Sequence, residues 1–201
     1  LYFASTMEGN WLATEFDMPF AFPSRIFRAK NLRFTPDSIE CDEPFVQIYP
    51  SVAGDTEDSA VVSLSVPRDG TGRLLAVTAT GKILYTSNAQ DFPVLWKTLY
   101  IASAEPSPIT SEPPRVIWDV AVDLEMGVFF LSVFHYGVLV GSLEDVESLP
   151  SGATITLYPH TEGLYCIETR MLCYDPESNF LFVGTDARST FRTYVETTGI
   201  H

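Results

Sequence analysis

Histidines are the side chains in this sequence best suited to acid–base or metal chemistry, because imidazole titrates near neutral pH and is a common metal ligand. Two of them stand out by position. His135 precedes Tyr136 in a short turn between two apolar segments, and His160 lies in a later connection. The chain has 3 His in all, and neither HxH nor HxxxH spacing occurs. The sequence therefore predicts no zinc site, no other metal site and no cofactor.

The acidic residues form clusters without the spacing that a dedicated site needs. Asp37, Glu40, Asp42 and Glu43 lie close together, but the DxDxDG pattern of a calcium loop is absent, so we expect a solvated loop. No GxSxG elbow, P-loop or GxGxxG motif follows a predicted strand, and no Ser/His/Asp triad is suggested by spacing. We therefore predict no catalytic residue, and the sequence favours a protein that is not an enzyme.

The composition and charge of the chain restrict its class and its partners. Hydrophobic residues make up 46% and charged residues 19%, which suits a packed globular domain. The 201 residues include 12 Lys and Arg against 26 Asp and Glu, for a formal net charge of -14. A surface of this sign repels phosphate backbones and anionic lipid headgroups. We expect a protein partner or self-association, with no nucleic acid bound and no membrane insertion.

The cysteines and the amino terminus bear on the compartment. Cys41, Cys166 and Cys173 are odd in number and lack CxxC spacing, which favours reduced thiols inside a cell. Residues 1–6 are interpreted as a tag or linker remnant, with Met7 as the native start. No signal peptide is predicted after Met7, since neither a basic nor an apolar region follows it. The expected location is intracellular, in the cytoplasm, unless a signal peptide was removed.

The elements that must position these residues come from an internal repeat of roughly 50 residues. Each copy has an apolar strand, an Asp-containing turn, a second apolar strand, a short polar turn and a third strand. The turn aspartates are Asp69, Asp123 and Asp175, 54 and then 52 residues apart. Asp bonds its own backbone two residues on, and the Gly or Asn that ends each turn tolerates a positive φ. The sequence therefore predicts consecutive β-hairpins.

Near-continuous apolar runs after the turn aspartates indicate strands that are buried on both faces. The clear copies of the repeat span about residues 60–110, 115–160 and 164–200, in a single domain predicted over 7–201. The predicted strands are Leu74–Thr78, Val128–Val133 and Phe180–Gly184, then Ile83–Thr86, Val138–Gly141 and Thr190–Tyr194, with candidate fourth strands at Trp96–Ile101 and Thr154–Tyr158.

The repeat predicts an all-β, β-propeller-like fold of three to four four-stranded antiparallel blades, each of about 50 residues. Residues 15–60 are a candidate for a fourth, degenerate copy, with strands at Arg25–Phe34 and Phe45–Tyr49. The ring either closes within this chain or is part of a larger propeller completed by missing sequence or another subunit. Helical signal is scarce, and Leu143–Leu149 is either a helical turn or a loop.

One segment carries a family resemblance. Leu84–Leu99 reads LYTSNAQDFPVLWKTL, in which Ser87, Asp91 and Trp96 match a degenerate Asp-box. The chain thus resembles the kelch-like and sialidase-like (BNR) propeller repeats, in which this box lies on the turn between a blade's third and fourth strands. The second copy keeps Ser142 and Asp145 without the Trp, and the third copy has no counterpart. The box is a folding element, so the resemblance implies a fold and not sialidase activity.

In a propeller, the turns between second and third strands share one face with the connections between blades, and function concentrates on such loops. We call this predicted surface the loop face. Its candidate binding residues are Lys82, His135, Tyr136, Asp186 and Arg188 in the turns, Arg115 and His160 in the connections, and Trp118 at the channel. The alternative is that these are ordinary turn residues, and that His135-Tyr136 covers the blade as a lid. Glu168 and Arg170 either pair with each other or present a polar channel.

Three functional hypotheses follow from the sequence. The first is a non-enzymatic, propeller-type module that binds a protein through the loop face. The second is a sialidase-like propeller with carbohydrate-binding or hydrolase activity, which rests on the Asp-box resemblance alone. The third is a structural part of a larger ring that another subunit completes.

Overall fold

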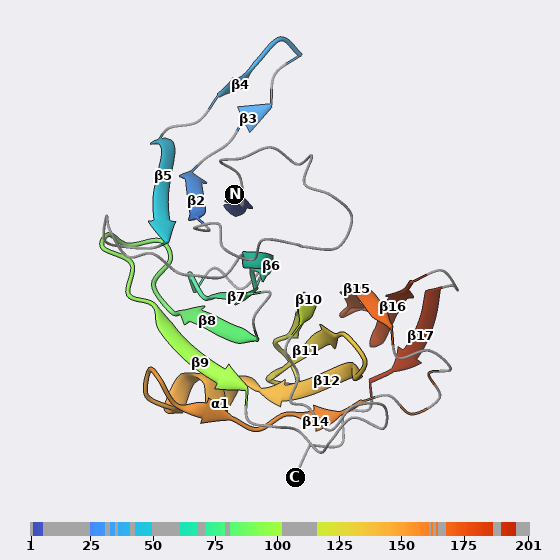
Figure 1. The fold of residues 1–201 in the computed structure, drawn as a ribbon. Coiled ribbons are helices and arrows are strands. Elements are labelled where there is room, and N and C mark those ends of the chain that lie inside the picture. Colours follow the sequence, from blue (N-terminus) through green and yellow to red (C-terminus); the bar gives the residue numbers. More distant parts are fainter. Residues whose placement is uncertain are drawn as a thin grey trace, which may run out of the picture.

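The chain is mostly β, and its strands form several antiparallel sheets (Figure 1). The computed structural model describes residues 2–5, 25–30, 33–34, 36–40, 43–49, 61–67, 71–78, 81–101, 116–160, 162, 164, 168–186 and 190–195. Within these residues, no helix is long and apolar enough to cross a membrane.

Each copy of the predicted repeat forms one sheet, and we name the three the first, second and third repeat sheets. The first contains β6 (Val61–Ser65), β7 (Leu74–Thr78), β8 (Lys82–Thr86) and β9 (Lys97–Ile101). The second contains β10 (Ile117–Asp123), β11 (Val128–Val133), β12 (Gly137–Ser142) and β14 (Tyr158–Pro159). The third contains β15 (Thr169–Asp175), β16 (Phe180–Thr185) and β17 (Thr190–Tyr194). Except for the candidate fourth strand at 154–158, the predicted strands of the three repeat sheets are confirmed to within one residue at each end.

A fourth sheet precedes the repeat sheets, as the sequence suggested for residues 15–60. This N-terminal sheet has the order β1 (Tyr2–Ser5), β2 (Arg25–Lys30), β5 (Glu43–Tyr49). The hairpin of β3 (Arg33–Phe34) and β4 (Ile39–Glu40) is inserted between β2 and β5. The sheet therefore includes β1, which comes from the segment interpreted as a linker remnant. The strand predicted over 25–34 is divided into β2 and β3, which belong to different sheets.

The hairpin turns use the chemistry that the repeat predicts. The Asp123 carboxylate accepts hydrogen bonds from the backbone N–H of Glu125 and Met126, at 3.0 and 3.2 Å. The turn ends at Gly127 with φ +68°, and the corresponding turn of the third sheet ends at Asn179 with φ 55°. Such left-handed backbone favours Gly and Asn, because neither pays a large steric cost there. Asp69, the first turn aspartate, lies outside the described residues.

The segment after β12 departs from the sequence prediction. Leu143–Ser148 forms α1, which settles the helix-or-loop alternative, and Ser142 caps it by accepting a hydrogen bond from Asp145 N–H. The predicted single strand at 154–158 is wrong, because it divides in two. β13 (Thr154–Ile155) pairs in parallel with β9 of the first repeat sheet, while β14 pairs with β12. The second copy of the repeat thus contributes an edge strand, β13, to the first repeat sheet.

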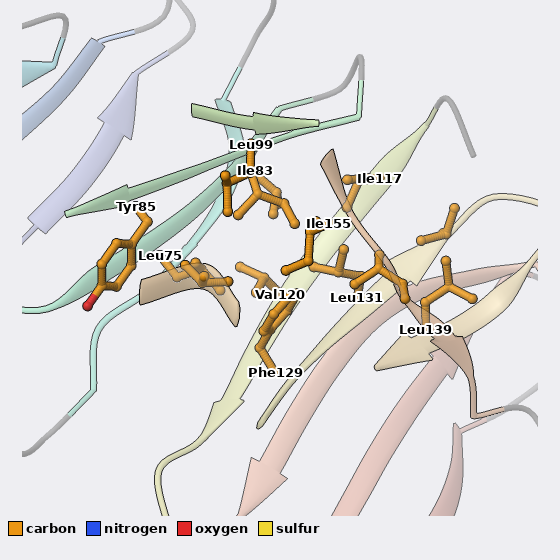
Figure 2. Close-up of a cluster of buried hydrophobic side chains, with 14 of the residues drawn as sticks. Leu75, Ile83, Tyr85, Leu99, Ile117, Val120, Phe129, Leu131, Leu139 and Ile155 are labelled. Atoms are coloured by element: carbon orange, nitrogen blue, oxygen red, sulfur yellow. The ribbon is translucent and has the colours of Figure 1, made fainter. Parts of the chain in front are cut away.

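Buried side chains fill the space between successive sheets. One cluster joins the N-terminal sheet to the first repeat sheet, through Ile26, Ile48, Leu74 and Leu84 among others. The largest cluster lies between the first and second repeat sheets (Figure 2). A further cluster joins the second repeat sheet to the third, with Phe130 opposite Leu181 and Val183. Each sheet is thus held mainly by its neighbours in the chain, as expected of stacked repeats.

The first strands of the three repeat sheets, β6, β10 and β15, lie beside one another and are joined through Asp119. One carboxylate oxygen of Asp119 accepts a hydrogen bond from Ser63 Oγ at 2.5 Å, and the other accepts one from Leu172 N–H at 2.8 Å. Thr169 Oγ1, at the start of β15, donates to Gly137 O beside the start of β10 at 2.8 Å. Arg73, beside the end of β6, donates to Glu147 of α1 beside the end of β10 at 3.1 Å, so the three strands run in the same direction. The sheets follow one another along an arc, with the N-terminal and third repeat sheets at its ends (Figure 1).

Candidate functional site

The turns predicted to share the loop face do lie at corresponding ends of their sheets. Backbone hydrogen bonds tie Phe134 N–H to Val116 O, just before β10, and Asp186 N–H to Glu168 O, just before β15, each at 2.9 Å. In the first repeat sheet, Gly81 N–H closes the turn on Thr78 O at 3.1 Å. Because β6, β10 and β15 run in the same direction, these turns face the same side of the molecule.

Two β-bulges determine which side chains the inner strands place at this side. The pairing of β10 with β11 shifts between Ile117 and Asp119, and that of β15 with β16 shifts between Thr169 and Met171. The extra residue of each bulge is Trp118 in one strand and Arg170 in the other. A bulge leaves a residue out of the ladder and re-aims its side chain. Trp118 and Arg170 are therefore repeat equivalents that project from neighbouring strands.

Trp118, Arg170 and Asp186 come together, and we name them the Trp118 cluster. The Arg170 guanidinium lies over the indole ring, with Cζ 4.1 Å from its centroid. The same guanidinium forms an ion pair with Asp186 Oδ2 at 2.7 Å. The Nε1 atom of Trp118 is buried and has no hydrogen-bond partner among the described residues. Arg170 thus pairs with Asp186. One alternative from the sequence had paired it with Glu168 instead.

The predicted dipeptide His135-Tyr136 does not form a surface pair. Tyr136 is only 8% exposed and belongs to the core between the first and second repeat sheets, so its place among surface binding residues is corrected. The aromatic ring is covered because burial of its apolar surface stabilises the fold. His135 has φ 63°, and its ring lies 3.8 Å from that of Phe134, centroid to centroid. This placement fits the alternative that His135-Tyr136 covers the blade as a lid.

The remaining candidates are scattered. Lys82 begins β8 at the loop-face end of its sheet, where its backbone N–H donates to Thr78 Oγ1 at 3.1 Å. His160 follows β14 and lines a cavity between the second and third repeat sheets, away from the Trp118 cluster. Burial lowers the pKa of His160 from its usual value, and the nearby Glu162 carboxylate partly opposes this. Arg115 and Arg188 lie outside the described residues.

The segment that resembles an Asp-box lies between β8 and β9, the third and fourth strands of the first repeat sheet, as the resemblance implies. Its contacts are structural. Arg28 of β2 donates to the carbonyl oxygens of Ala89 and Asp91, at 2.6 and 2.9 Å. The Trp96 indole N–H donates to Ile48 O of β5 at 2.6 Å. The loop thus fastens the first repeat sheet to the N-terminal sheet.

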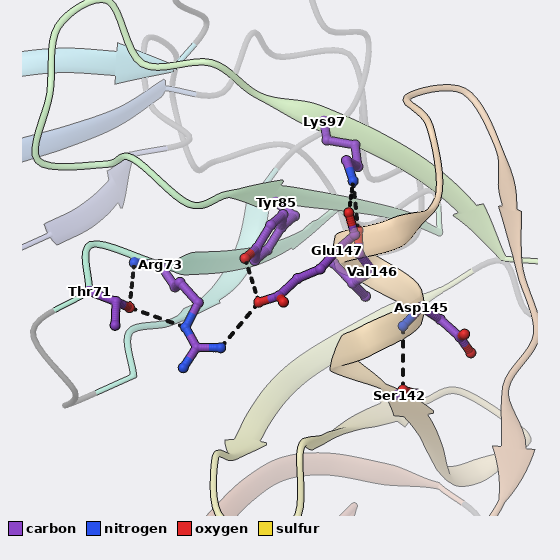
Figure 3. A network of polar contacts seen from close by, with 8 residues as sticks. All are labelled: Thr71, Arg73, Tyr85, Lys97, Ser142, Asp145, Val146 and Glu147. Carbon is purple, nitrogen blue, oxygen red and sulfur yellow. Dashed lines mark hydrogen bonds and ion pairs between the residues drawn. The ribbon is translucent and has the colours of Figure 1, made fainter.

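Charged groups that the sequence did not single out gather at the opposite ends of the strands (Figure 3). Arg73 and the Tyr85 hydroxyl both donate to Glu147 Oε1 of α1, at 3.1 and 2.9 Å. Lys97 Nζ donates to the carbonyl oxygens of Val146 and Glu147, at 3.0 and 2.7 Å, near the carboxyl end of the helix. These contacts hold α1 on the first repeat sheet beside an open cavity of about 700 Å³. With both cations engaged, the arrangement is mainly structural.

Metal-binding and redox groups are sparse in the described part of the chain. No group of three or more His, Cys, Asp or Glu side chains there is arranged to hold a metal ion. Cys173 is a free, exposed thiol on β15, while Cys41 and Cys166 lie outside the described residues.

Comparisons with known proteins identify no family for this chain. No family model matches this sequence, and no curated protein matches it. Among solved structures, the chain is similar to the crystal structure of Myxococcus xanthus glutaminyl cyclase, at 11% sequence identity and a TM-score of 0.44. The match covers 86% of this chain and 70% of that chain. A likeness of this size carries no information about activity.

Proposed function

We propose that the protein is an interaction module of β-propeller type, in which the repeat sheets are blades and the loop face binds a protein partner around the Trp118 cluster. The assignment rests on one observation. Trp118 and Arg170 project from equivalent bulges on adjoining strands and stack, with Asp186 orienting the guanidinium. Trp and Arg are the side chains most enriched among residues that dominate binding energy at protein interfaces.

The chemistry of the cluster supports this use. Asp186 is half exposed and can pair with a basic residue of the partner. The net charge of -14 also favours a basic partner, since charge complementarity steers association. The strands that carry Trp118 and Arg170 are part of paired sheets, which keeps the site pre-formed.

Arg170→Gln tests this proposal. Loss of a residue that dominates the binding energy costs about 2 kcal/mol or more of binding free energy, which is roughly a 30-fold loss of affinity. With the purified chain as bait, proteins captured by the wild type should be lost with Arg170→Gln. The matched control is Arg73→Gln, because Arg73 also forms a surface ion pair but lies at the opposite ends of the strands. Equal capture by both variants and the wild type would exclude the loop face.

A second candidate function is assembly through the free face of the third repeat sheet. Phe182 occupies in β16 the position that Phe130 occupies in β11 and Leu75 in β7. Within the part of the chain that the structure describes, a following sheet covers Phe130 and Leu75 but not Phe182. Met171 is 68% exposed and Tyr194 52% exposed on the same face. A sheet from another chain, as in a larger ring, would cover these side chains.

Light scattering distinguishes the two candidates. If the free face drives assembly, the solution mass should exceed the 22.3 kDa of one chain and increase with concentration. Met171→Lys should then return the mass to that of a monomer, because it places a charge in an apolar contact. Ser178→Lys, in an exposed turn of the same sheet, is the control. A monomer at every concentration would reject self-assembly and leave the loop face as the candidate.

A further inference from the structure

A second, separate binding site is indicated by the cavity that His160 lines. The cavity has a volume of about 510 Å³ and lies between the second and third repeat sheets, where strands β14 and β17 form its walls. Its floor is apolar, since Val128, Phe130 and Val140 are all buried. An apolar cavity with a few polar groups is the usual form of a small-ligand site.

Aromatic rings border this floor. Tyr158, which pairs with Val140 in the second repeat sheet, lines the cavity and is 49% exposed. The Phe130 ring lies 5.7 Å from the His160 ring, centroid to centroid. The faces of Tyr and Phe rings carry negative partial charge and attract a cation placed over them. The lining thus offers apolar contact and a preference for positive charge at once.

The polar groups of the cavity also favour a positively charged ligand. Of the described residues that line the cavity, Glu162 is charged and none is a Lys or Arg. The Nε2 atom of His160 is buried and has no hydrogen-bond partner among the described residues. Burial lowers the pKa of His160, which favours the neutral imidazole, and one nitrogen of a neutral imidazole accepts a hydrogen bond. A neutral acceptor and a carboxylate suit an ammonium donor and do not suit an anion.

We propose that this cavity binds the side chain of a lysine from a basic peptide, with the alkyl stem on the apolar floor and the ammonium group between Glu162, His160 and Tyr158. The net charge of -14 favours the approach of such a peptide. The site does not include the Trp118 cluster, so the proposal holds whether or not the loop face binds a partner. It also requires no residue outside the described part of the chain.

The test compares two probes that differ in one group. N-acetyl-lysine methylamide carries the ammonium, and N-acetyl-norleucine methylamide has the same stem without it. In an NMR titration of the full chain, the lysine probe should shift the amide signals of Tyr158, His160 and Tyr194. It should bind about 10-fold more tightly than the norleucine probe, as expected when a single charged contact is worth about 1.4 kcal/mol. Equal binding of the two probes would overturn the proposal.

Two variants test which side chains of the cavity attract the ammonium group of the lysine probe. Glu162→Gln should weaken the lysine probe about 5-fold and leave the norleucine probe unchanged, because it removes only the carboxylate charge. Glu40→Gln is the matched control, since Glu40 is exposed in β4 of the N-terminal hairpin. Tyr158→Leu should also weaken the lysine probe more than the norleucine probe, because it removes the ring that faces the cavity. Signal shifts outside the cavity, or equal affinities for Glu162→Gln and Glu40→Gln, would contradict the assignment.

Discussion

Phe129→Ala is expected to lower the free energy of unfolding by about 3–5 kcal/mol, the largest effect of any single substitution argued for this chain. Phe129 is 0% exposed in the core between the first and second repeat sheets (Figure 2). Removing the ring leaves a cavity that neighbouring sheets cannot fill, because their side chains are held by paired strands. Urea denaturation followed by circular dichroism would measure the loss.

Gly141 provides an independent check on this packing. It pairs with Phe129 across β11 and β12, and a Cβ added to it would lie 2.7 Å from Phe129 Cε1 and 2.6 Å from Leu157 Cδ2. Gly141→Ala should therefore cost about 1–3 kcal/mol in the wild type, and less when Phe129 is already Ala. The comparison variant is Gly184→Ala, whose Cβ would lie 3.3 Å from Met171 Cβ. Additive costs for Phe129→Ala and Gly141→Ala would contradict the packing.

The sequence predicted the repeat sheets well because each copy combines two strong local signals. β7 and β11 are continuous apolar runs, and the structure buries every residue of both. The turns between strands end in residues that tolerate left-handed backbone, such as Gly127 and Asn179. Local pattern and final fold agree at these positions, which is why strand bounds could be read within a residue.

The predictions failed where contacts over long sequence separations decide the outcome. Nothing local distinguishes β13 from β14, yet one pairs with β9 and the other with β12. Glu147 is 74 residues from Arg73 and 62 from Tyr85, so the sequence offered no reason to join them. Tyr136 was expected at the surface because turns are usually exposed, but its ring reaches back into the core.

The candidate site was predictable in part. Trp118 and Asp186 were both assigned to the loop face, and the structure brings them together through Arg170. The register of the repeat does contain the missing signal, because Arg170 lies 5 residues before Asp175 as Trp118 lies 5 before Asp123. What the sequence lacks is the stacking itself, which depends on two bulges and on the contact between β10 and β15.

Asp119→Ala should have the second large effect, a loss of about 2–4 kcal/mol in the free energy of unfolding. Its carboxylate accepts hydrogen bonds from Ser63 Oγ, from its own neighbour Val120 N–H and from Leu172 N–H. A hydrogen bond to a charged group contributes about 1.5–3 kcal/mol, and a partly buried donor left without its acceptor adds to the loss. One side chain thus joins the inner strands of all three repeat sheets.

Asp119→Asn separates the contribution of these bonds from that of the residue's size. The amide keeps one acceptor oxygen, but in either orientation its NH₂ group faces a backbone N–H, that of Val120 or that of Leu172. The loss should therefore lie between those of the wild type and Asp119→Ala. Asp91→Ala, in the exposed loop between β8 and β9, is the control and should change stability by less than about 0.5 kcal/mol.

A double-mutant cycle with Ser63→Ala completes the argument. Since Ser63 and Asp119 contact directly at 2.5 Å, their coupling energy should be about 1–2 kcal/mol, and chemical denaturation of the four variants would give it. Strict additivity would mean that Asp119 supports only its own strand and the third sheet through Leu172. A clear coupling would mean that this contact links β6 to β10, the strand that Asp119 also joins to β15 through Leu172 N–H.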